Sequence, residues 1–121
     1  MAERLIAIID DDESLRSALL ALVRSLGYRG IGFASAEEFL ASAESRGSAC
    51  IVTDIQMSGI SGIELTQRLI AQGTAAPVIL ITARTEPALL DRAQHCGALC
   101  VLRKPFAAEA LIGCLETALA A

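Results

Sequence analysis

The chain has 121 residues, of which 54% are hydrophobic, and a formal net charge of −4 at pH 7. A chain of this length buries roughly two-thirds of the surface that its unfolded form exposes, which is enough for one hydrophobic core. Its apolar runs fall well short of the roughly 18 to 20 residues that cross a bilayer, and its ten basic residues are scattered. The composition therefore argues against a membrane protein and against nucleic-acid binding by this chain alone.

The cysteines and the first residues indicate a reducing compartment. Cys50, Cys96, Cys100 and Cys114 form no C-x-x-C pair, and most of them lie in apolar segments where a thiol acts as a small hydrophobe. His95, Cys96 and Cys100 match no standard zinc spacing, so core filling explains them better than metal binding. The opening residues MAER lead into a short apolar run without the features of a signal peptide. We therefore expect a soluble, cytoplasmic protein.

The first part of the chain alternates short apolar runs with helical patterns. Residues 5–9 are typical of a buried strand, and the apolar positions after them follow the spacing of one helix face up to a stop at Gly27. A less regular apolar run at residues 28–33 predicts a second strand. Ser35 and Glu38 have the spacing of a capping box, so a second helix is expected to begin at that serine.

The rest of the chain repeats this alternation. Strands are expected at residues 49–53, 78–82 and 98–102. Ser61 and Glu64 have capping-box spacing ahead of the third helix. The ends of the third and fourth helices and the apolar face of the fifth are marked by Gly73, Gly97, Leu111, Ile112, Leu115 and Leu119. We predict one α/β domain over residues 1–121, a doubly wound, flavodoxin-like five-stranded parallel sheet of order 2-1-3-4-5 with helices on both faces.

Polar residues gather where the predicted strands end. Asp10 and Asp11 follow the first strand, Asp54 ends the third, Thr82 ends the fourth and Lys104 follows the fifth. The carboxyl ends of parallel strands share one edge of the sheet, and ligands bind where the strand order reverses. Because the first and third strands are neighbours in this order, we expect the three aspartates to share a pocket.

Such a cluster of acids needs a counter-charge. Two carboxylates about 4 Å apart repel by roughly 4 kcal/mol at an effective dielectric of 20. Few, hard oxygen ligands suit Mg²⁺, which commonly bridges protein carboxylates to a phosphate. The ammonium of Lys104 and the hydroxyl of Thr82 would complete a phosphate site, in which Asp54 is the best-placed nucleophile. Acids after a strand can also simply cap the next helix, and Asp12 or Glu13 is expected to do so.

These residues resemble the receiver domain of two-component response regulators, over essentially the whole chain. The matching stretches are IIDDDES, VTDIQMSGISGIEL, PVILITA and CGALCVLRKPF. The stretches DIQMSGISGIEL and LRKPF resemble receivers that precede a helix-turn-helix domain. The resemblance implies that Mg²⁺ binds to Asp10, Asp11, Asp54 and the backbone carbonyl of Gln56. It also implies that Asp54 accepts a phosphoryl group from a histidine kinase or phosphotransfer protein, without turnover of a separate substrate.

The same resemblance describes how a signal would leave the site. Thr82 and Lys104 would hold the phosphoryl oxygens, and movement of the threonine would shift the surface of the fourth helix, fifth strand and fifth helix. A downstream output domain or docking protein would recognise this surface, and a homodimer formed on phosphorylation is another option. The family also allows a cis peptide bond between Lys104 and Pro105.

Three positions depart from the usual family pattern. Val101 replaces a common tyrosine or phenylalanine, whose ring moves inward when the threonine moves. With valine at this position, the output is expected to rely on loop and helix shifts or to be weakly coupled. Ser58 replaces a common proline after the acceptor and leaves Gly59 and Gly62 to shape the turn. Arg84 lies at a variable position, where it could screen the phosphoryl group, contact the kinase or be a solvated surface side chain.

Two other functions fit part of the sequence. IIDDDES loosely fits the motif of haloacid-dehalogenase-type phosphatases, with Asp10 as nucleophile and Asp12 as general acid, but Asp54 would then have no role. A receiver-like module that binds partners without phosphorylation is the other alternative, which Val101 mildly favours. Because the chain ends soon after the fifth helix, it is expected to be either a stand-alone receiver or a piece of a larger regulator.

Overall fold

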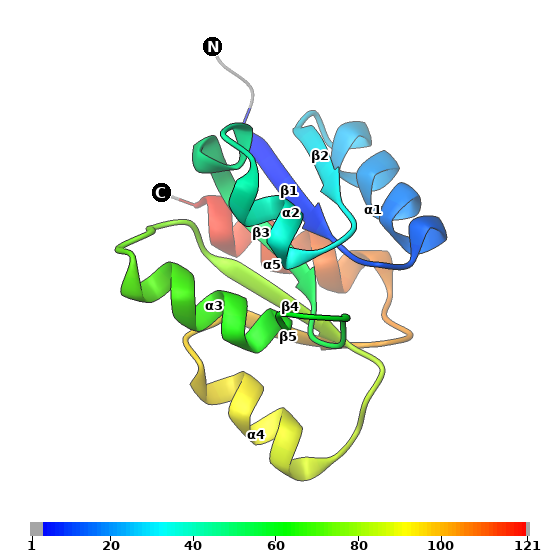
Figure 1. The fold of residues 1–121 in the computed structure, drawn as a ribbon. Helices are drawn as coiled ribbons and strands as arrows, with labels where there is room; N and C mark the ends of the chain where they lie inside the picture. The colour runs from blue at the N-terminus through cyan, green and yellow to red at the C-terminus, as the bar shows by residue number, and fades with distance from the viewer. Residues whose placement is uncertain (1–3, 121) are drawn as a thin grey trace.

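The computed structural model describes residues 4–120 and alternates strands with helices along the chain (Figure 1). The strands are β1 (Leu5–Ile9), β2 (Arg29–Phe33), β3 (Ser48–Asp54), β4 (Val78–Thr82) and β5 (Cys100–Arg103). The helices are α1 (Glu13–Ser25), α2 (Ala36–Ala41), α3 (Gly62–Ala71), α4 (Pro87–His95) and α5 (Ala108–Leu119), and a short 3-10 helix, η1 (Glu44–Gly47), precedes β3. Within the described residues, no helix has the length and apolar character needed to span a membrane.

The sheet has the predicted topology. All neighbouring strands are parallel, and their order is β2-β1-β3-β4-β5. The strand order reverses between β1 and β3, where Ile9 is paired with Thr53. The residues that follow this pair, Asp10 and Asp54, therefore emerge side by side at the carboxyl edge. The predicted α/β, doubly wound, flavodoxin-like fold is confirmed.

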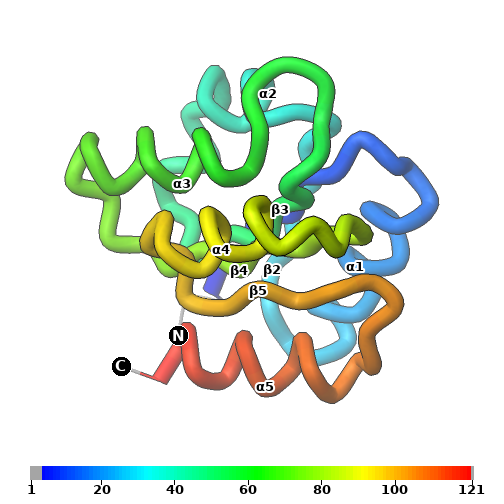
Figure 2. Tube along the Cα trace, turned by 90° about the horizontal axis from the view of Figure 1, so that it is seen from below, coloured from blue at the N-terminus to red at the C-terminus, as the bar shows by residue number. Residues whose placement is uncertain are grey.

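Two apolar layers hold the helices against the sheet. Figure 2 shows α5 on one side of the strands and α3 and α4 on the other. In β1, alternate residues serve opposite layers: Ile6 and Ile8 face the layer of α1 and α5, while Ala7 and Ile9 face the layer of α2, α3 and α4. Each of these residues is at most 1% exposed. Burial on both faces explains why LIAII and VILIT are continuous apolar runs.

The expected helix starts are confirmed. The hydroxyls of Ser35 and Ser61 accept hydrogen bonds from the amides of Glu38 and Glu64, both at 3.1 Å. Asp12 caps α1, since its Oδ1 accepts from the amides of Ser14 and Leu15 at 3.0 and 3.2 Å. These side chains satisfy amides that have no partner within the first turn of a helix, and so fix where each helix begins.

Several element boundaries differ from the expectation. β3 runs from Ser48 to Asp54, one residue longer at each end than residues 49–53, and Asp54 ends it as expected. The prediction of a strand at residues 98–102 was wrong at both ends, because β5 pairs with β4 only from Cys100 to Arg103. The sequence analysis also missed η1, which follows a second helix of only six residues. Short elements give too little periodic pattern to fix their ends.

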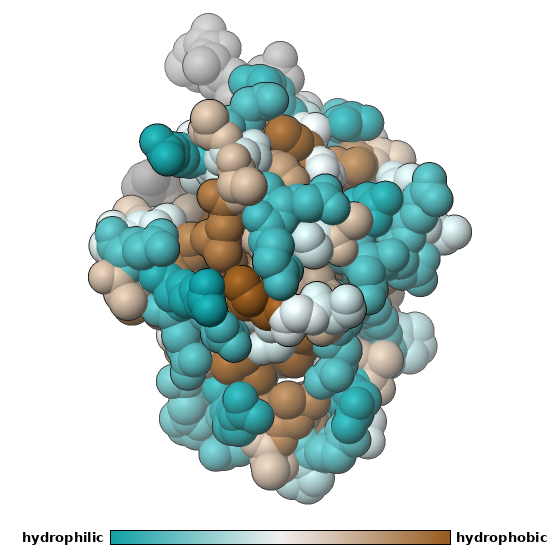
Figure 3. Space-filling view, viewed as in Figure 1, coloured by the Kyte–Doolittle hydropathy of each residue, from teal (hydrophilic) through white to brown (hydrophobic). Residues whose placement is uncertain are grey.

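Figure 3 shows apolar side chains gathered in a hollow between α2 and α3. This is a cavity of about 560 Å³ whose lining includes Phe39, Leu40, Ser48 and Leu69. Because Ser48 is the first residue of β3 and Asp54 is the last, the cavity lies at the opposite edge of the sheet from the acids. The phosphate site expected from the sequence is therefore not this cavity.

Candidate functional site

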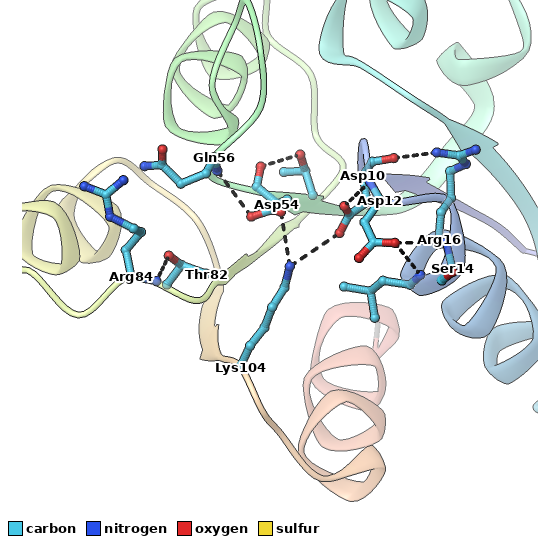
Figure 4. A network of polar contacts seen from close by, with 11 residues as sticks. Asp10, Asp12, Ser14, Arg16, Asp54, Gln56, Thr82, Arg84 and Lys104 are labelled. Carbon is cyan, nitrogen blue, oxygen red and sulfur yellow. Dashed lines mark hydrogen bonds and ion pairs between the residues drawn. The ribbon is translucent and has the colours of Figure 1, made fainter.

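The structure brings three carboxylates together at the carboxyl edge of the sheet, and Figure 4 shows two of them, those of Asp10 and Asp54, with the side chain of Lys104 between them. Asp10, Asp11 and Asp54 each offer a carboxylate oxygen, and these oxygens all lie within 4.8 Å of one another. Asp10 and Asp54 are 1% and 7% exposed, whereas Asp11 faces solvent. Carboxylates this close repel strongly, and two of the three are shielded from water. The cluster can therefore bind a small, hard cation.

Lys104 places a positive charge beside two of these carboxylates. Its Nζ lies 3.2 Å from Oδ2 of Asp54 and 3.8 Å from Oδ2 of Asp10. Its own amide donates to the carbonyl of Thr82 at 2.8 Å, which ties the segment after β5 to the end of β4. The peptide bond from Lys104 to Pro105 is cis, as the resemblance allowed.

Asp10 is the most buried acid of the cluster. Its Oδ1 accepts from the amide of Asp12 at 2.9 Å, whereas its Oδ2 is buried and has no hydrogen-bond donor among the described residues. Burial raises the pKa of the Asp10 carboxyl, and the charges of Asp54 and Asp11 add to that effect against the opposing Asp12 amide and Lys104. A buried carboxylate oxygen without a donor is costly in water-excluded surroundings. A cation at this oxygen would remove the cost.

Asp54 is held by the backbone around it. Its Oδ1 accepts from the amide of Gln56 at 3.2 Å, while Oδ2 faces Lys104. Gly62 begins α3 against the strand end, so that a Cβ at this position would lie 2.4 Å from the carbonyl oxygen of Asp54. The close approach of α3 is possible only because residue 62 lacks a side chain. The Asp54 carboxylate is therefore fixed in orientation, with one oxygen toward the loop and one toward the lysine.

Thr82 and Arg84 lie on the side of the site formed by β4. Thr82 is fully buried, and its Oγ1 accepts from the amide of Arg84 at 3.0 Å. Nε and Nη2 of Arg84 each lie 2.7 Å from Oε1 of Glu86, and both side chains are about half exposed. This pair favours the surface role among the three that the sequence left open for Arg84.

Two residues that contact this region were missed by the sequence analysis. Nη1 of Arg16 in α1 donates to the carbonyl of Asp10 at 2.7 Å, and so holds the segment that carries the acidic pair. Oε2 of Glu37 in α2 accepts from the amide of Ile60, in the loop after Asp54, at 3.1 Å. The contact of Arg16 could have been predicted, because this residue lies near the start of the helix that follows the acidic segment. Glu37 gave none, because it lies in a different element from the loop that it contacts.

The chain is similar to known response regulators over almost its whole length. A family model described as the response regulator receiver domain matches residues 6–116. The response regulator protein TmoT of Ectopseudomonas mendocina is 35% identical over 97% of this chain and 53% of its own length. The transcriptional regulatory protein FixJ of Azorhizobium caulinodans is 38% identical over 93% of this chain and 53% of its own length.

The solved structures agree with the sequence comparison. The structure of FixJ-N is 30% identical and has a TM-score of 0.87. The match covers 99% of this chain and 96% of FixJ-N. The response regulator StyR is 36% identical with a TM-score of 0.86, where the match covers 98% of this chain and 60% of StyR. The chain spans about half the length of the curated relatives it matches. Together with the family match over residues 6–116, these similarities show that the chain belongs to the response-regulator receiver domain family.

Proposed function

We propose that this receiver domain is switched by Mg²⁺-dependent phosphorylation of Asp54. The observation that carries the proposal is the convergence of three carboxylates with the ammonium of Lys104 at the end of β1 and β3. The phosphoryl donor would be a histidine kinase or a phosphotransfer protein, and we place this exchange in the cytoplasm. Residues 1–121 would act as one receiver unit toward a downstream output domain or docking protein.

The ligands of the proposed metal site are Asp10, Asp11, Asp54 and the backbone carbonyl of Gln56. The donor set suits Mg²⁺ because it consists of few oxygen ligands beside open positions, which leaves room for water and for a phosphate. The Oδ2 of Asp10 supports this assignment, since it is a buried anionic oxygen that accepts no hydrogen bond from the described residues and has the ammonium of Lys104 only at 3.8 Å. When bound, the ion would neutralise charge on the transferring phosphoryl group.

The residues of the chain would position and stabilise the reacting groups. A carboxylate oxygen of Asp54 would form the new bond to phosphorus while the bond from phosphorus to the donor's histidine nitrogen breaks. The electron pair of the broken bond goes to that nitrogen, and because the other ring nitrogen carries a proton, neutral imidazole leaves. Lys104, 3.2 Å from Asp54 Oδ2, would attract the incoming phosphoryl oxygens. The Thr82 hydroxyl would donate a hydrogen bond to one of these oxygens, since its own oxygen already accepts a hydrogen bond from the amide of Arg84.

The response would travel through β4 and β5. The amide of Lys104 bonds the carbonyl of Thr82 at 2.8 Å, so that movement of the threonine would shift the end of β5 as well. Val101 of β5 is paired with Leu80 of β4 and packs, partly buried, against the layer that α4 covers. A valine has few rotamers and little volume to move, so we propose that helix and loop shifts, rather than an aromatic ring, carry the change. The altered surface would comprise α4, β5 and α5.

The phosphatase alternative is less compatible with the geometry. Its general acid would be Asp12, but the Asp12 carboxylate already accepts from two amides at the start of α1. A carboxylate used as a helix cap is oriented toward the amides of its own helix, which does not suit contact with a leaving group. A receiver that binds partners without being phosphorylated remains the second candidate, supported only by Val101 in place of an aromatic residue.

Intact-mass measurement tests the proposal directly. The purified chain is incubated with Mg²⁺ and acetyl phosphate, beside Asp54→Asn and a sample with EDTA. We expect wild type to gain one phosphoryl mass that both controls lack. Labelling of Asp54→Asn would return attention to Asp10 and the phosphatase. No labelling under any condition would favour the binding-only module.

A further inference from the structure

The loop between β3 and α3, residues 55–61, carries Gln56 beside the acid cluster. Its two ends are fixed by backbone bonds, because the amide of Ile55 donates to the carbonyl of Ile81 at 2.9 Å and the amide of Gly62 donates to the carbonyl of Ile55 at 3.0 Å. The turn between these ends contains Ser58 and Gly59, and Gly59 has a φ of +83°. Glycine in such a turn loses much conformational freedom on folding, so the turn needs a contact that holds it.

Glu37 provides that contact from another element. Its Oε2 accepts a hydrogen bond from the amide of Ile60 at 3.1 Å, across 23 positions of sequence. The carboxylate also lies directly over the turn, since a Cβ on Gly59 would fall 2.1 Å from the same oxygen. A charged acceptor makes a stronger hydrogen bond to an amide than a neutral one does. The carboxylate of Glu37 thus contacts the loop at Gly59 and Ile60.

The neighbouring Glu38 separates this role from a general effect of charge. Glu37 and Glu38 both lie in the first turn of α2, where any carboxylate interacts favourably with the positive end of the helix. Of these two residues, Glu37 is hydrogen-bonded to the loop through its carboxylate. The bond at Glu38 is made by its backbone amide, which donates to the hydroxyl of Ser35. The two residues therefore share an environment on the helix and differ in their contact with Ile60.

We infer that Glu37 is a positioning residue, whose carboxylate holds the 55–61 loop so that the carbonyl of Gln56 stays available to the metal site. This inference rests on the proposed function, because it assigns the loop a role in binding Mg²⁺. The effect would pass from Glu37 to Ile60 and along the loop to Gln56, whose amide is bonded to Oδ1 of Asp54 at 3.2 Å. Glu37 itself would touch neither the ion nor the phosphoryl group.

The test compares Glu37→Ala, Glu37→Gln and the matched control Glu38→Ala with wild type. Hydrogen exchange of the Ile60 amide, followed by NMR without metal, reports the contact itself. We expect this amide to exchange about tenfold faster in Glu37→Ala and to be unchanged in Glu38→Ala. Mg²⁺ affinity, measured by titration calorimetry, should fall about three- to tenfold in Glu37→Ala, which is part of the value of a hydrogen bond to a charged group. Glu37→Gln, which keeps an acceptor oxygen, should recover most of the loss.

The outcomes separate the inference from the proposed function. Equal Mg²⁺ affinity in Glu37→Ala and wild type overturns the positioning role, whatever the exchange data show. Equal losses in Glu37→Gln and Glu37→Ala, or a matching loss in Glu38→Ala, would mean that charge rather than the hydrogen bond acts, and also overturn it. If wild type itself neither binds Mg²⁺ nor is labelled by acetyl phosphate, the proposed function is wrong and the role of Glu37 falls with it.

Discussion

Lys104 lies 3.2 Å from Asp54 although 50 positions of sequence separate them, and a whole strand lies between their elements. Asp54 ends β3, Lys104 follows β5, and β4 runs between those two strands. The long side chain reaches across the end of β4 to place its ammonium at the acids. One ammonium faces three carboxylates, so the metal-free site keeps an excess of negative charge. Charge changes in this cluster should therefore alter stability and metal binding in opposite directions.

Replacing Lys104 by methionine should lower stability and raise Mg²⁺ affinity. Loss of the ammonium leaves Asp54 and Asp10 without their counter-charge, which should cost about 1 to 2 kcal/mol after allowance for the partial exposure of Lys104. The same loss removes a cation that competes with Mg²⁺, so the metal should bind more tightly while labelling by acetyl phosphate slows. Urea unfolding without metal and Mg²⁺ titration measure the two effects.

The neighbouring Arg103→Met is the matched control for Lys104→Met. Arg103 is exposed and lies next to Lys104 at the end of β5, so its replacement removes one positive charge without changing the contacts of the cluster. We expect little change in stability or in affinity. If Lys104→Met bound Mg²⁺ more weakly than Arg103→Met, the ammonium would be assisting the metal rather than competing with it.

Asp10→Asn should stabilise the metal-free protein and abolish Mg²⁺ binding. Burial raises the pKa of Asp10 above its ordinary value of 3.8, so the folded state binds this proton more tightly than the unfolded state and ionisation destabilises the fold. The penalty is absent well below pH 3.8 and complete above the raised pKa. At neutral pH we expect a gain of about 1 to 2 kcal/mol in the free energy of unfolding, the scale of a buried polar group that lacks a hydrogen bond.

A pH series checks the sign of the Asp10 effect. The difference in unfolding free energy between Asp10→Asn and wild type should shrink as the pH falls toward 3.8, because wild-type Asp10 becomes protonated as well. Asp11→Asn is the comparison, since Asp11 is exposed and should give a smaller change. A destabilised Asp10→Asn at neutral pH would mean that the pairing with Lys104 outweighs the cost of burial.

The sequence predicted the features that depend on local patterns. Continuous apolar runs identified the buried strands, and the serines at positions 35 and 61 fixed two helix starts, because a cap acts within its own turn. The predicted strand order placed Asp10 and Asp54 at one edge of the sheet, because the first and third strands are neighbours in it. The contact of Glu37 could not be predicted in this way, since it joins elements whose relative position depends on the packing of the whole fold. The strand β5 and the 3-10 helix η1 are too short for a periodic pattern to fix their ends.

Thr82→Ala should leave phosphorylation possible and weaken the response to it. The variant loses the oxygen that accepts from the amide of Arg84, which should cost about 1 kcal/mol of stability. It also loses the hydroxyl that we propose moves to the phosphoryl group. Amide shifts of α4, β5 and α5 on phosphorylation, recorded by NMR, should be smaller than in wild type. Thr82→Ser keeps the hydroxyl and should behave like wild type, and equal shifts in the alanine variant would remove Thr82 from the path.

Two glycine replacements should have opposite effects on stability. Gly113 is an exposed residue within α5, and a Cβ there would meet nothing within 4 Å, so Gly113→Ala should stabilise the helix by about 1 kcal/mol. A Cβ on Gly62 would lie 2.4 Å from the backbone carbonyl of Asp54, and because a backbone atom cannot rotate away, α3 would have to shift from the end of β3. Gly62→Ala should therefore cost about 1 to 3 kcal/mol, as other overpacked sites do.

Thermal unfolding measures the effect of both glycine variants, and labelling by acetyl phosphate separates their consequences for the site. Gly113→Ala should be labelled at the wild-type rate, because α5 contributes no residue to the acid cluster. Gly62→Ala should be labelled more slowly even at temperatures where it is fully folded, since the added Cβ would displace the backbone carbonyl of Asp54. A folded Gly62→Ala with wild-type labelling would show that the carboxylate is oriented by Gln56 and Lys104 alone, independently of how closely α3 packs against the strand.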